Sequence, residues 1–289
     1  MSIEVKNLNH VYMADTPFEA HALNQISLSI ADGEFIGIIG HTGSGKSTLI
    51  SHLNGLEKSP AGTVFVDGLD LGGGEVRLSD VRRKVGLVFQ YPEYQLFEET
   101  VAKDIAFGPR NLKLSDSEVQ ARVQRAMQQV GLDPSLGERS PFELSGGQKR
   151  RVAIAGVLAM EPGTLILDEP AAGLDPAGRR DMLALIQGIH ARGVTVVMVS
   201  HSMDDVGQLC DRVFVLNHGA LAFSGTPGEV FRHGRELRAI GLDVPACAAL
   251  ASKLRKAGFE LPEGLYAMED VARAILKDLK AGEGAKHDR

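Results

Sequence analysis

The sequence predicts an α/β fold with a parallel sheet at its centre, and three observations support this. Residues 34–39 form a short, continuous apolar run of the kind found in buried parallel strands. A glycine-rich segment and a helical pattern follow this run at once, which is the context that a phosphate-binding loop requires. After residue 160, short apolar strands and helical patterns alternate, as they do in parallel sheets that carry helices on both faces. We therefore expect a core of the phosphate-loop NTPase type.

The N-terminal part of the chain has the pattern of β-structure. Residues 3–11 and 24–30 alternate apolar and polar side chains, with turn residues between the two runs. They predict an antiparallel β-subdomain in front of the core. Residues 46–56 form the helix that follows the glycine-rich loop, and further short strands are expected at residues 63–66 and 85–89.

The pattern changes to helix between residues 99 and 160, which predicts a helical subdomain inserted into the α/β core. A capping box at residues 115–118 opens one helix, and Gly131 ends it. A second helix is expected over residues 145–160. After this insertion, strands are expected at residues 164–167, 194–200, 213–216 and 221–223, with helices at residues 176–191 and 203–210.

From about residue 235 the chain changes to two amphipathic helical patterns, at residues 244–258 and 267–279. We therefore expect a main domain over residues 1–234 and a small C-terminal helical appendix over residues 235–280. The remaining residues, 281–289, are predicted to form a disordered tail.

Charge, cysteine spacing and the length of apolar runs argue against a nucleic-acid binder, a cysteine metal site and a membrane-spanning protein. The net charge of −6 argues against a nucleic-acid binder, which would usually carry a basic face. Cys210 and Cys247 lack metal-ligand spacing, which indicates two unremarkable thiols in a reducing cytosol. The first residues do not match a signal peptide, and the longest uncharged apolar run, residues 152–160, is shorter than the roughly 18 residues of a membrane-spanning helix. If the protein works at a membrane, we expect it to do so as a peripheral subunit.

Residues 40–48 match the phosphate-loop pattern G-x-x-x-x-G-K-[ST] without departure. Glycines allow backbone N–H groups to converge on phosphates, and the helix that follows adds the positive end of its dipole. We expect Lys46 to reach the β- and γ-phosphates of ATP, and the Ser47 hydroxyl to ligate Mg²⁺. The expected nucleotide-binding residues of the loop are Gly40, His41, Thr42, Gly43, Ser44, Gly45, Lys46, Ser47 and Thr48. His41 occupies a variable position of the pattern, and we assign it no chemistry of its own.

A carboxylate pair, Asp168 and Glu169, ends the apolar strand that begins at residue 164. We expect Asp168 to hold Mg²⁺ and Glu169 to polarise the water that attacks the γ-phosphate. An apolar strand that ends in two acidic residues is by itself usually a solvated strand end. The prediction therefore depends on the phosphate loop elsewhere in the chain.

The sequence Leu144-Ser145-Gly146-Gly147-Gln148 opens a predicted helix with two glycines. Backbone amides and the helix dipole at such a position form an anion site, although Ser145 would also serve as an ordinary helix cap. A chain with one phosphate loop has no need of a second phosphate-binding site. A head-to-tail dimer does need one, because each chain could then close the nucleotide site of the other.

Six motifs together resemble the nucleotide-binding subunit of an ATP-binding cassette (ABC) transporter over residues 2–232. They are the phosphate loop, Gln90, LSGGQ, LILDEP, Gly173-Leu174-Asp175-Pro176 and His201. The resemblance implies that Gln90 couples the Mg²⁺ and γ-phosphate site to a membrane partner, and that His201 contacts the γ-phosphate. Lys46, Gln90, Glu169 and His201 form the expected catalytic set, and Ser47, Gln90 and Asp168 the expected metal ligands. The resemblance also implies that Asp175 lies at the dimer seam, that Tyr12 stacks on adenine, and that Ser145, Gly147 and Gln148 contact the nucleotide of the partner.

Three segments, residues 16–19, 88–111 and 138–162, are similar to the ATPase subunits of energy-coupling factor importers, which take up vitamins or transition-metal ions. The Thr-Pro-Phe-Glu insert resembles the second of two paralogous ATPases in the vitamin-type systems. The resemblance implies that the segment 235–280 serves in ATPase pairing. One departure from the family pattern is Ala171, where a threonine is usual, and no catalytic group is lost there.

The resemblance implies a peripheral subunit on the cytoplasmic face of the cell membrane. Its expected partners are a second ATPase in a heterodimer or homodimer, a transmembrane coupling protein and a substrate-binding membrane subunit, without nucleic acid. Other interpretations stay open: a soluble ABC ATPase of DNA repair or translation, the ATPase of a binding-protein-dependent importer, or a phosphate-loop kinase. We expect the basic run at residues 149–151 to be a solvated helix face.

Overall fold

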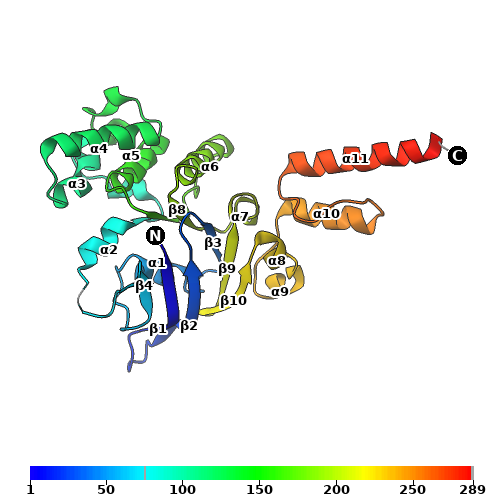
Figure 1. Ribbon diagram of the computed structural model, residues 1–289, viewed down its shortest axis with the longest axis horizontal. Helices are drawn as coiled ribbons and strands as arrows, with labels where there is room; N and C mark the ends of the chain where they lie inside the picture. Colours follow the sequence, from blue (N-terminus) through cyan, green and yellow to red (C-terminus); the bar gives the residue numbers. More distant parts are fainter. Residues whose placement is uncertain (75, 288–289) are drawn as a thin grey trace.

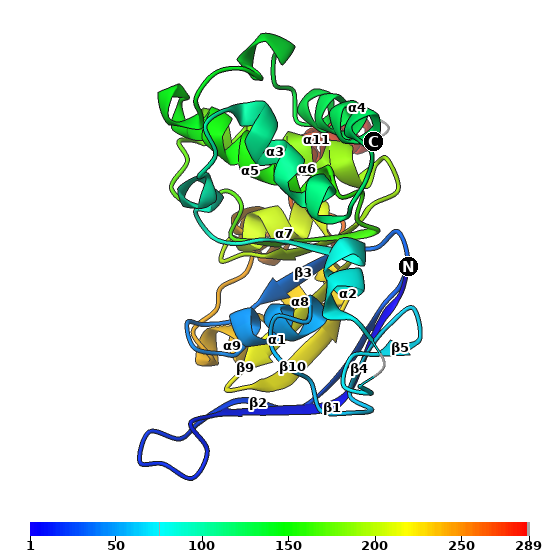
Figure 2. The same ribbon diagram turned by 90° about the vertical axis from the view of Figure 1, so that its left-hand side faces the viewer.

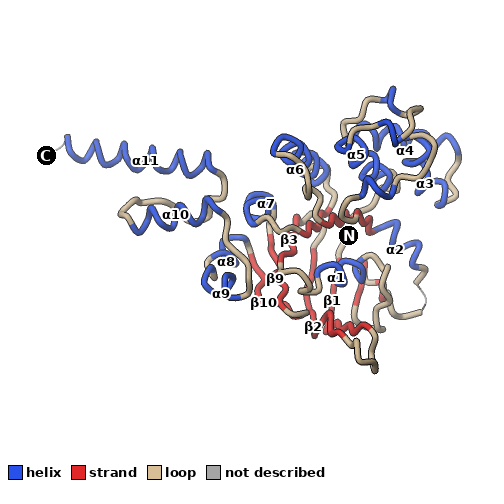
Figure 3. The backbone as a smooth tube through the Cα atoms, turned by 180° about the vertical axis from the view of Figure 1, so that it is seen from behind, coloured by secondary structure: helices blue, strands red, loops and turns tan. Residues whose placement is uncertain are grey.

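The computed structural model describes residues 1–74 and 76–287, and its centre is a six-stranded sheet with the order β10-β9-β3-β8-β7-β6. Five strands run parallel and β10 pairs antiparallel with β9 at one edge. Figure 3 shows β3, β9 and β10 as neighbouring red strands. The strands are β3 (Phe35–Ile39), β6 (Val85–Val88), β7 (Thr164–Asp168), β8 (Thr195–Val199), β9 (Arg212–Asn217) and β10 (Ala220–Gly225). The parallel sheet confirms the α/β fold predicted from the sequence.

The central strands are buried on both faces because their side chains alternate between two apolar cores. In β3, Phe35 and Ile39 belong to one core, whereas Ile36 and Ile38 belong to the other. Strands β7 and β8 divide their side chains between the two cores in the same way. This two-sided burial explains the continuous apolar runs in the sequence.

A second, antiparallel sheet has the order β2-β1-β4-β5, and it confirms the predicted N-terminal β-subdomain. It consists of β1 (Ile3–Tyr12), β2 (Ala20–Ile30), β4 (Val64–Val66) and β5 (Leu69–Asp70). Its inward side chains share one apolar core with helix α1 (Lys46–Leu53) and with one face of the central sheet. Figure 2 shows α1 between the two sheets.

The helices α3 (Val101–Asn111), α4 (Asp116–Gln129) and α5 (Gly146–Leu158) pack together on the other side of the central sheet (Figures 1 and 2). The Ser115 hydroxyl accepts the N–H of Glu118 at 3.3 Å and so caps α4, as the sequence predicts. The remaining helices of the main body are α2 (Leu78–Lys84), α6 (Pro176–His190) and α7 (Met203–Leu209), with single turns at Pro92–Gln95, Pro134–Leu136 and Pro141–Glu143.

The chain ends in α8 (Pro227–Phe231), α9 (Gly234–Ala239), α10 (Ala246–Lys256) and α11 (Met268–His287). Leu237 of α9 still packs into the main core, whereas Cys247 belongs to a separate small apolar cluster between α10 and α11. Figure 1 shows α10 and α11 projecting from the main body. The side chains therefore stop packing into the main core and start packing into the small cluster near α10. This change lies C-terminal to residue 235, where the sequence suggested a boundary.

The helix α11 is longer than the sequence predicted. It includes residues 281–287, for which we expected disorder, because this alanine-, glutamate- and lysine-containing stretch can continue a helix despite its two glycines. Residues 288 and 289, the rest of the predicted tail, lie outside the described residues. Among the helices that the structure describes, none combines the length and the apolar character needed to cross a membrane.

Candidate nucleotide site

Four segments meet at the carboxyl edge of the central sheet. The strands β3, β8, β7 and β6 are parallel neighbours, so the segments that follow them emerge side by side. The phosphate loop follows β3 and His201 follows β8, while Asp168 and Glu169 end β7 and Gln90 follows β6. The fold thus brings together candidate residues that are widely separated in the sequence.

The phosphate loop leaves little room for side chains at two of its glycines. A Cβ atom on Gly40 would approach the Ser44 hydroxyl to 2.4 Å, and one on Gly45 would approach the backbone oxygen of Ala22 to the same distance. Gly45 also has a φ of 101°, which other residues rarely adopt. The buried Ser44 hydroxyl has no hydrogen-bond partner among the described residues. The loop is therefore closely fitted to its surroundings, and it holds a buried hydroxyl without a partner among the described residues.

Lys46 is curled into this loop. Its ammonium group donates hydrogen bonds to the backbone oxygens of Gly40, at 2.7 Å, and His41, at 2.9 Å. Burial lowers the pKa of Lys46, and the nearby carboxylates of Glu169 and Asp168 oppose this shift. The cation is thus surrounded by the loop and faces the two acidic residues that the sequence singled out.

Asp168 and Ser47 form the candidate metal site. Burial raises the pKa of Asp168, whereas Lys46 and a hydrogen bond with Ser47 act in the opposite direction. A carboxylate and a hydroxyl fit Mg²⁺, which takes one or two protein oxygens and completes its shell with water and nucleotide phosphates. The described residues contain no group of three or more histidine, cysteine, aspartate or glutamate side chains that could hold a metal by itself. The pair therefore suits an ion that arrives with a nucleotide.

Glu169 and His201 face each other across the ends of β7 and β8. Glu169 Oε1 lies 3.4 Å from His201 Nε2, and it accepts no hydrogen bond of good geometry among the described residues. The backbone N–H of Glu169 donates to Val199 at 3.0 Å, and its φ of 50° is unusual for a residue other than glycine. Burial raises the pKa of Glu169 to about 7, and burial followed by the charge of Lys46 lowers the pKa of His201. A strained backbone conformation such as that of Glu169 is typical of functional sites.

The other residues of the predicted site border this centre. The Tyr12 hydroxyl lies 3.2 Å from the Thr48 hydroxyl, which places the ring beside the phosphate loop. His41 contacts Asn217 at 3.1 Å, and the Gln90 side chain is exposed. The Asp175 carboxylate accepts the N–H of Gly178 at 2.7 Å and so caps α6.

The signature motif, Ser145–Gln148 in the sequence, does not take part in this centre. Ser145 and Gln148 cap each other: the Ser145 N–H donates to the Gln148 side chain at 3.0 Å, and the Gln148 N–H donates to the Ser145 hydroxyl at 3.3 Å. Gly146 and Gly147 are exposed, with open space where a Cβ would lie. In the part of the chain that the structure describes, no hydrogen bond or ion pair joins residues 145–148 to the phosphate loop. The motif instead presents the N-terminus of α5 to the outside.

Arg150 is a residue whose role the sequence analysis missed. Its predicted place on a solvated helix face is wrong, because the side chain is only 3% exposed. It forms a two-pronged ion pair with Glu93, at 2.7 and 3.0 Å, and donates to the backbone oxygens of Pro170 and Ala172 at 3.1 and 2.9 Å. Arg150 therefore connects α5, the helix that begins with the signature motif, to the segment after Gln90 and to the turn after Glu169. The helical spacing of the sequence could have indicated that Arg150 is buried, because Ile154 and Leu158 lie on the same face of α5 and are buried as well.

Comparisons with known proteins agree with this geometry. A family model described as ABC transporter matches residues 23–172. The fold is similar to that of CbiO1 from Clostridium perfringens, part of the ABC transporter complex CbiONQ, with 38% identity and a TM-score of 0.72 over 86% of this chain and 98% of that one. It is also similar to a dimeric ATP-binding cassette in a post-hydrolysis state with ADP and phosphate, at 28% identity and a TM-score of 0.67 over 78% of this chain and 98% of that one. The fold is that of an ABC ATPase.

Curated relatives define the family more narrowly. The chain is 55% identical over 282 residues to the energy-coupling factor transporter ATP-binding protein EcfA2 of Clostridium perfringens, covering 97% of this chain and 99% of the relative. It is 56% identical over 285 residues to the EcfA2 protein of Symbiobacterium thermophilum, covering 99% of each chain. The chain belongs to the energy-coupling factor transporter ATP-binding proteins. This membership favours an importer ATPase over the repair, translation and kinase alternatives that the sequence left open.

Replacing Arg150 tests the tie between the three segments. Arg150→Leu leaves the Glu93 carboxylate and two backbone oxygens without their cationic partner, so we expect the free energy of unfolding to fall by about 3 kcal/mol. Urea denaturation measures this change. Lys149→Leu is the matched control, since it removes the neighbouring charge, and its effect should stay within about 0.5 kcal/mol. Equal losses in the two variants would show that Arg150 is not a structural tie.

Proposed function

We propose that this chain, an ATPase subunit of an energy-coupling factor importer, hydrolyses ATP at a site that it shares with a second ATPase subunit. The observation that carries this proposal is the outward-facing signature motif, which is separated from the phosphate loop of its own chain. Exposed glycines at the start of a helix are suited to bind phosphate through backbone N–H groups. A second subunit would bring its own phosphate loop to this helix, and its signature motif would close the loop of this chain.

In this proposal Lys46 exchanges its present partners for phosphate oxygens. The ammonium group would leave the carbonyl groups of Gly40 and His41 and pair with the β- and γ-phosphates, while the backbone N–H groups of residues 40–48 surround them. The Tyr12 hydroxyl contacts the Thr48 hydroxyl at the end of this loop, and from there the ring would stack on the adenine. Binding would thus be achieved mainly by the loop and by the start of α1.

We propose that Ser47 and Asp168 hold Mg²⁺ together with the nucleotide, and that Gln90 completes the set from the neighbouring strand. When bound, Mg²⁺ neutralises charge on the phosphates. This chain would hold the three metal-ligating side chains at one edge of the central sheet. Gln90 also comes directly before a segment in which Tyr91, Tyr94 and Phe97 are exposed, so its position would change if a partner moved that segment.

Glu169 is the proposed general base. Its Oε1 atom has no hydrogen-bond partner among the described residues, and the left-handed backbone fixes the side chain at the end of β7. A carboxylate held in this way can accept a proton from the water that attacks the γ-phosphate. His201, 3.4 Å away, would orient the γ-phosphate and the carboxylate relative to each other.

The proposed contact with the membrane partner is the segment 91–99. Tyr94 and Phe97 are 84% and 59% exposed, and the Phe97 ring packs edge-on against Phe107 at 5.0 Å between centroids. An exposed aromatic cluster of this kind is typical of a protein interface. Its place directly after Gln90 would transmit closure of the nucleotide site to a transmembrane coupling protein on the cytoplasmic face of the membrane. Vitamins or transition-metal ions stay the predicted substrates, and a separate membrane subunit would select them.

The variant Glu169→Gln tests the proposed base. We expect ATP hydrolysis to fall by about a hundredfold or more, because the amide cannot accept the proton, while ATP stays bound. Turnover and retained nucleotide would be measured in the same preparation. Glu138→Gln, on an exposed loop, should behave like the parent protein. Hydrolysis at the parental rate by Glu169→Gln would contradict the assignment.

The double variant Tyr94→Ala with Phe97→Ala tests the coupling surface. We expect the ATPase activity of the isolated subunits to stay within about twofold of the parent, because the two rings pack against Tyr91 and Phe107, outside the nucleotide site. Co-purification with the membrane subunits should be lost. The control replaces Met13 and Phe18, which are also exposed apolar side chains, at the tip of the β1–β2 hairpin. Normal co-purification and uptake with Tyr94 and Phe97 replaced would rule out this surface.

A further inference from the structure

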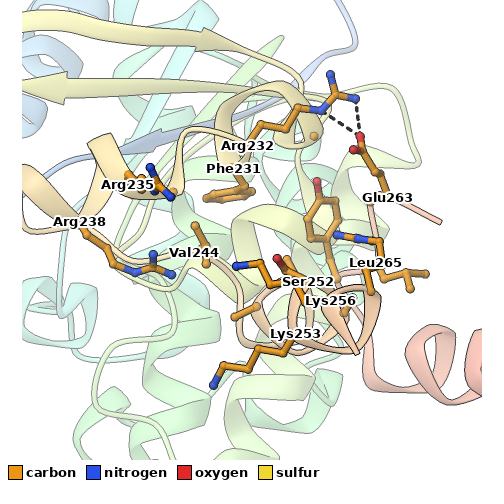
Figure 4. Close-up of a pocket in the computed structure, with 18 residues that line it drawn as sticks. Phe231, Arg232, Arg235, Arg238, Val244, Ser252, Lys253, Lys256, Glu263 and Leu265 are labelled. Atoms are coloured by element: carbon orange, nitrogen blue, oxygen red, sulfur yellow. Dashed lines mark hydrogen bonds and ion pairs between the residues drawn. The ribbon is translucent and has the colours of Figure 1, made fainter. Parts of the chain in front are cut away.

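A pocket of about 500 Å³ lies where the C-terminal helices join the main body. Its walls come from α8 and α9 on one side and from α10 and the following segment 263–266 on the other. Figure 4 shows Arg235 and Arg238 on one side of the opening, with Ser252, Lys253 and Lys256 across from them. The volume is within the range of about 300–1,000 Å³ that is usual for small-molecule sites. None of its lining residues belongs to the nucleotide site described above.

The pocket is strongly basic in a chain whose net charge is −6. One acidic residue, Glu263, lines it, together with the six basic residues Arg232, Arg235, Arg238, Lys253, Arg255 and Lys256. Crowding of like charges disfavours the folded state unless an anion compensates it. The concentration of positive charge therefore indicates an anionic ligand.

Three of the six cations already have partners. Arg232 pairs with Glu263 at 2.9 Å, Arg238 pairs with Asp243 at 3.3 Å, and Arg255 donates to the backbone oxygen of Pro262 at 2.7 Å. No ion pair engages the other three, Arg235, Lys253 and Lys256, within the described part of the chain. These three cations come from both walls of the pocket, so one anion between the walls could pair with groups on each.

The floor of the pocket is apolar. Phe231, Leu265 and Val244 line it, with Phe231 and Leu265 largely buried, and the Tyr266 ring packs edge-on against Phe231 at 6.0 Å between centroids. A bare inorganic anion would leave this surface without a partner. A ligand that has both an anionic group and an organic part would use the cations and the floor together.

We propose that this pocket binds a small organic phosphate, such as a nucleoside or sugar phosphate. Its phosphate groups pair with Arg235, Lys253 and Lys256, and its organic part lies against Phe231 and Val244. The same ligand bridges the C-terminal helices to the main body, where the present links include Gln208 to the backbone oxygen of Tyr266, at 3.0 Å, and the Ala246 N–H to Asp204, at 2.8 Å.

Calorimetric titration with GDP and with inorganic pyrophosphate tests the site. The full chain carries Lys46→Ala and is kept in EDTA, which weakens binding at the phosphate loop. We expect saturable binding of GDP that is tighter than that of pyrophosphate, because only GDP reaches the apolar floor. Adding Arg235→Ser and Lys256→Ser should weaken GDP binding by about tenfold or more, since each loses a charge-assisted contact.

The matched control adds Arg273→Ser and Lys277→Ser, two exposed cations of α11 outside the pocket, and should leave GDP binding unchanged. Absence of saturable GDP binding would overturn the proposal, as would equal losses in the two double variants. If pyrophosphate bound as tightly as GDP, the proposed contact between the organic part of the ligand and the apolar floor would be excluded. Sedimentation with phosphatidylglycerol vesicles that depended on Arg235 and Lys256, without GDP binding, would assign the pocket to a lipid surface instead.

Discussion

The parallel pairing of β3, β8, β7 and β6 is the constraint on which the proposed chemistry depends. Because the strands are neighbours with the same direction, their carboxyl ends deliver the phosphate loop, His201, the Asp168–Glu169 pair and Gln90 to one edge. Two apolar cores hold the sheet from both faces and fix this edge. Charges of opposite sign then meet there, with Lys46 inside its loop and two carboxylates facing it.

In the proposed function, the same arrangement leaves the site incomplete within one chain. The signature motif begins α5, which belongs to the helical layer, and its glycines face outward. Arg150 of α5 is buried against Glu93 and against the turn after Glu169, so it joins the helix that carries the motif to the edge where Glu169 lies. A partner that binds the exposed segment after Gln90 would act on the same ion pair. One buried cation thus connects the nucleotide edge, the proposed seam between subunits and the proposed membrane contact.

Local patterns allowed much of this to be predicted from the sequence. The phosphate loop, the strand that ends in Asp168 and Glu169 and the capped start of α5 are each set by adjacent residues, so their sequences suffice. The ion pair between Glu93 and Arg150 joins positions 57 residues apart, so the helical spacing that places Arg150 on the buried face of α5 does not reveal its partner. The basic pocket has the same origin, since it forms only where α8 and α9 meet α10. The length of α11 was misjudged because the last residues of a chain are commonly disordered, whereas this helix continues to His287.

The specific ATPase activity as a function of subunit concentration tests the shared site most directly. We expect the activity per chain to fall on dilution and to recover when ATPase subunits are added, because a lone phosphate loop lacks the signature motif that closes it. Ser145→Arg should abolish this recovery while ATP binding to the phosphate loop of the same chain persists. A specific activity that stayed constant on dilution would contradict the shared site and would mean that one chain is sufficient for hydrolysis.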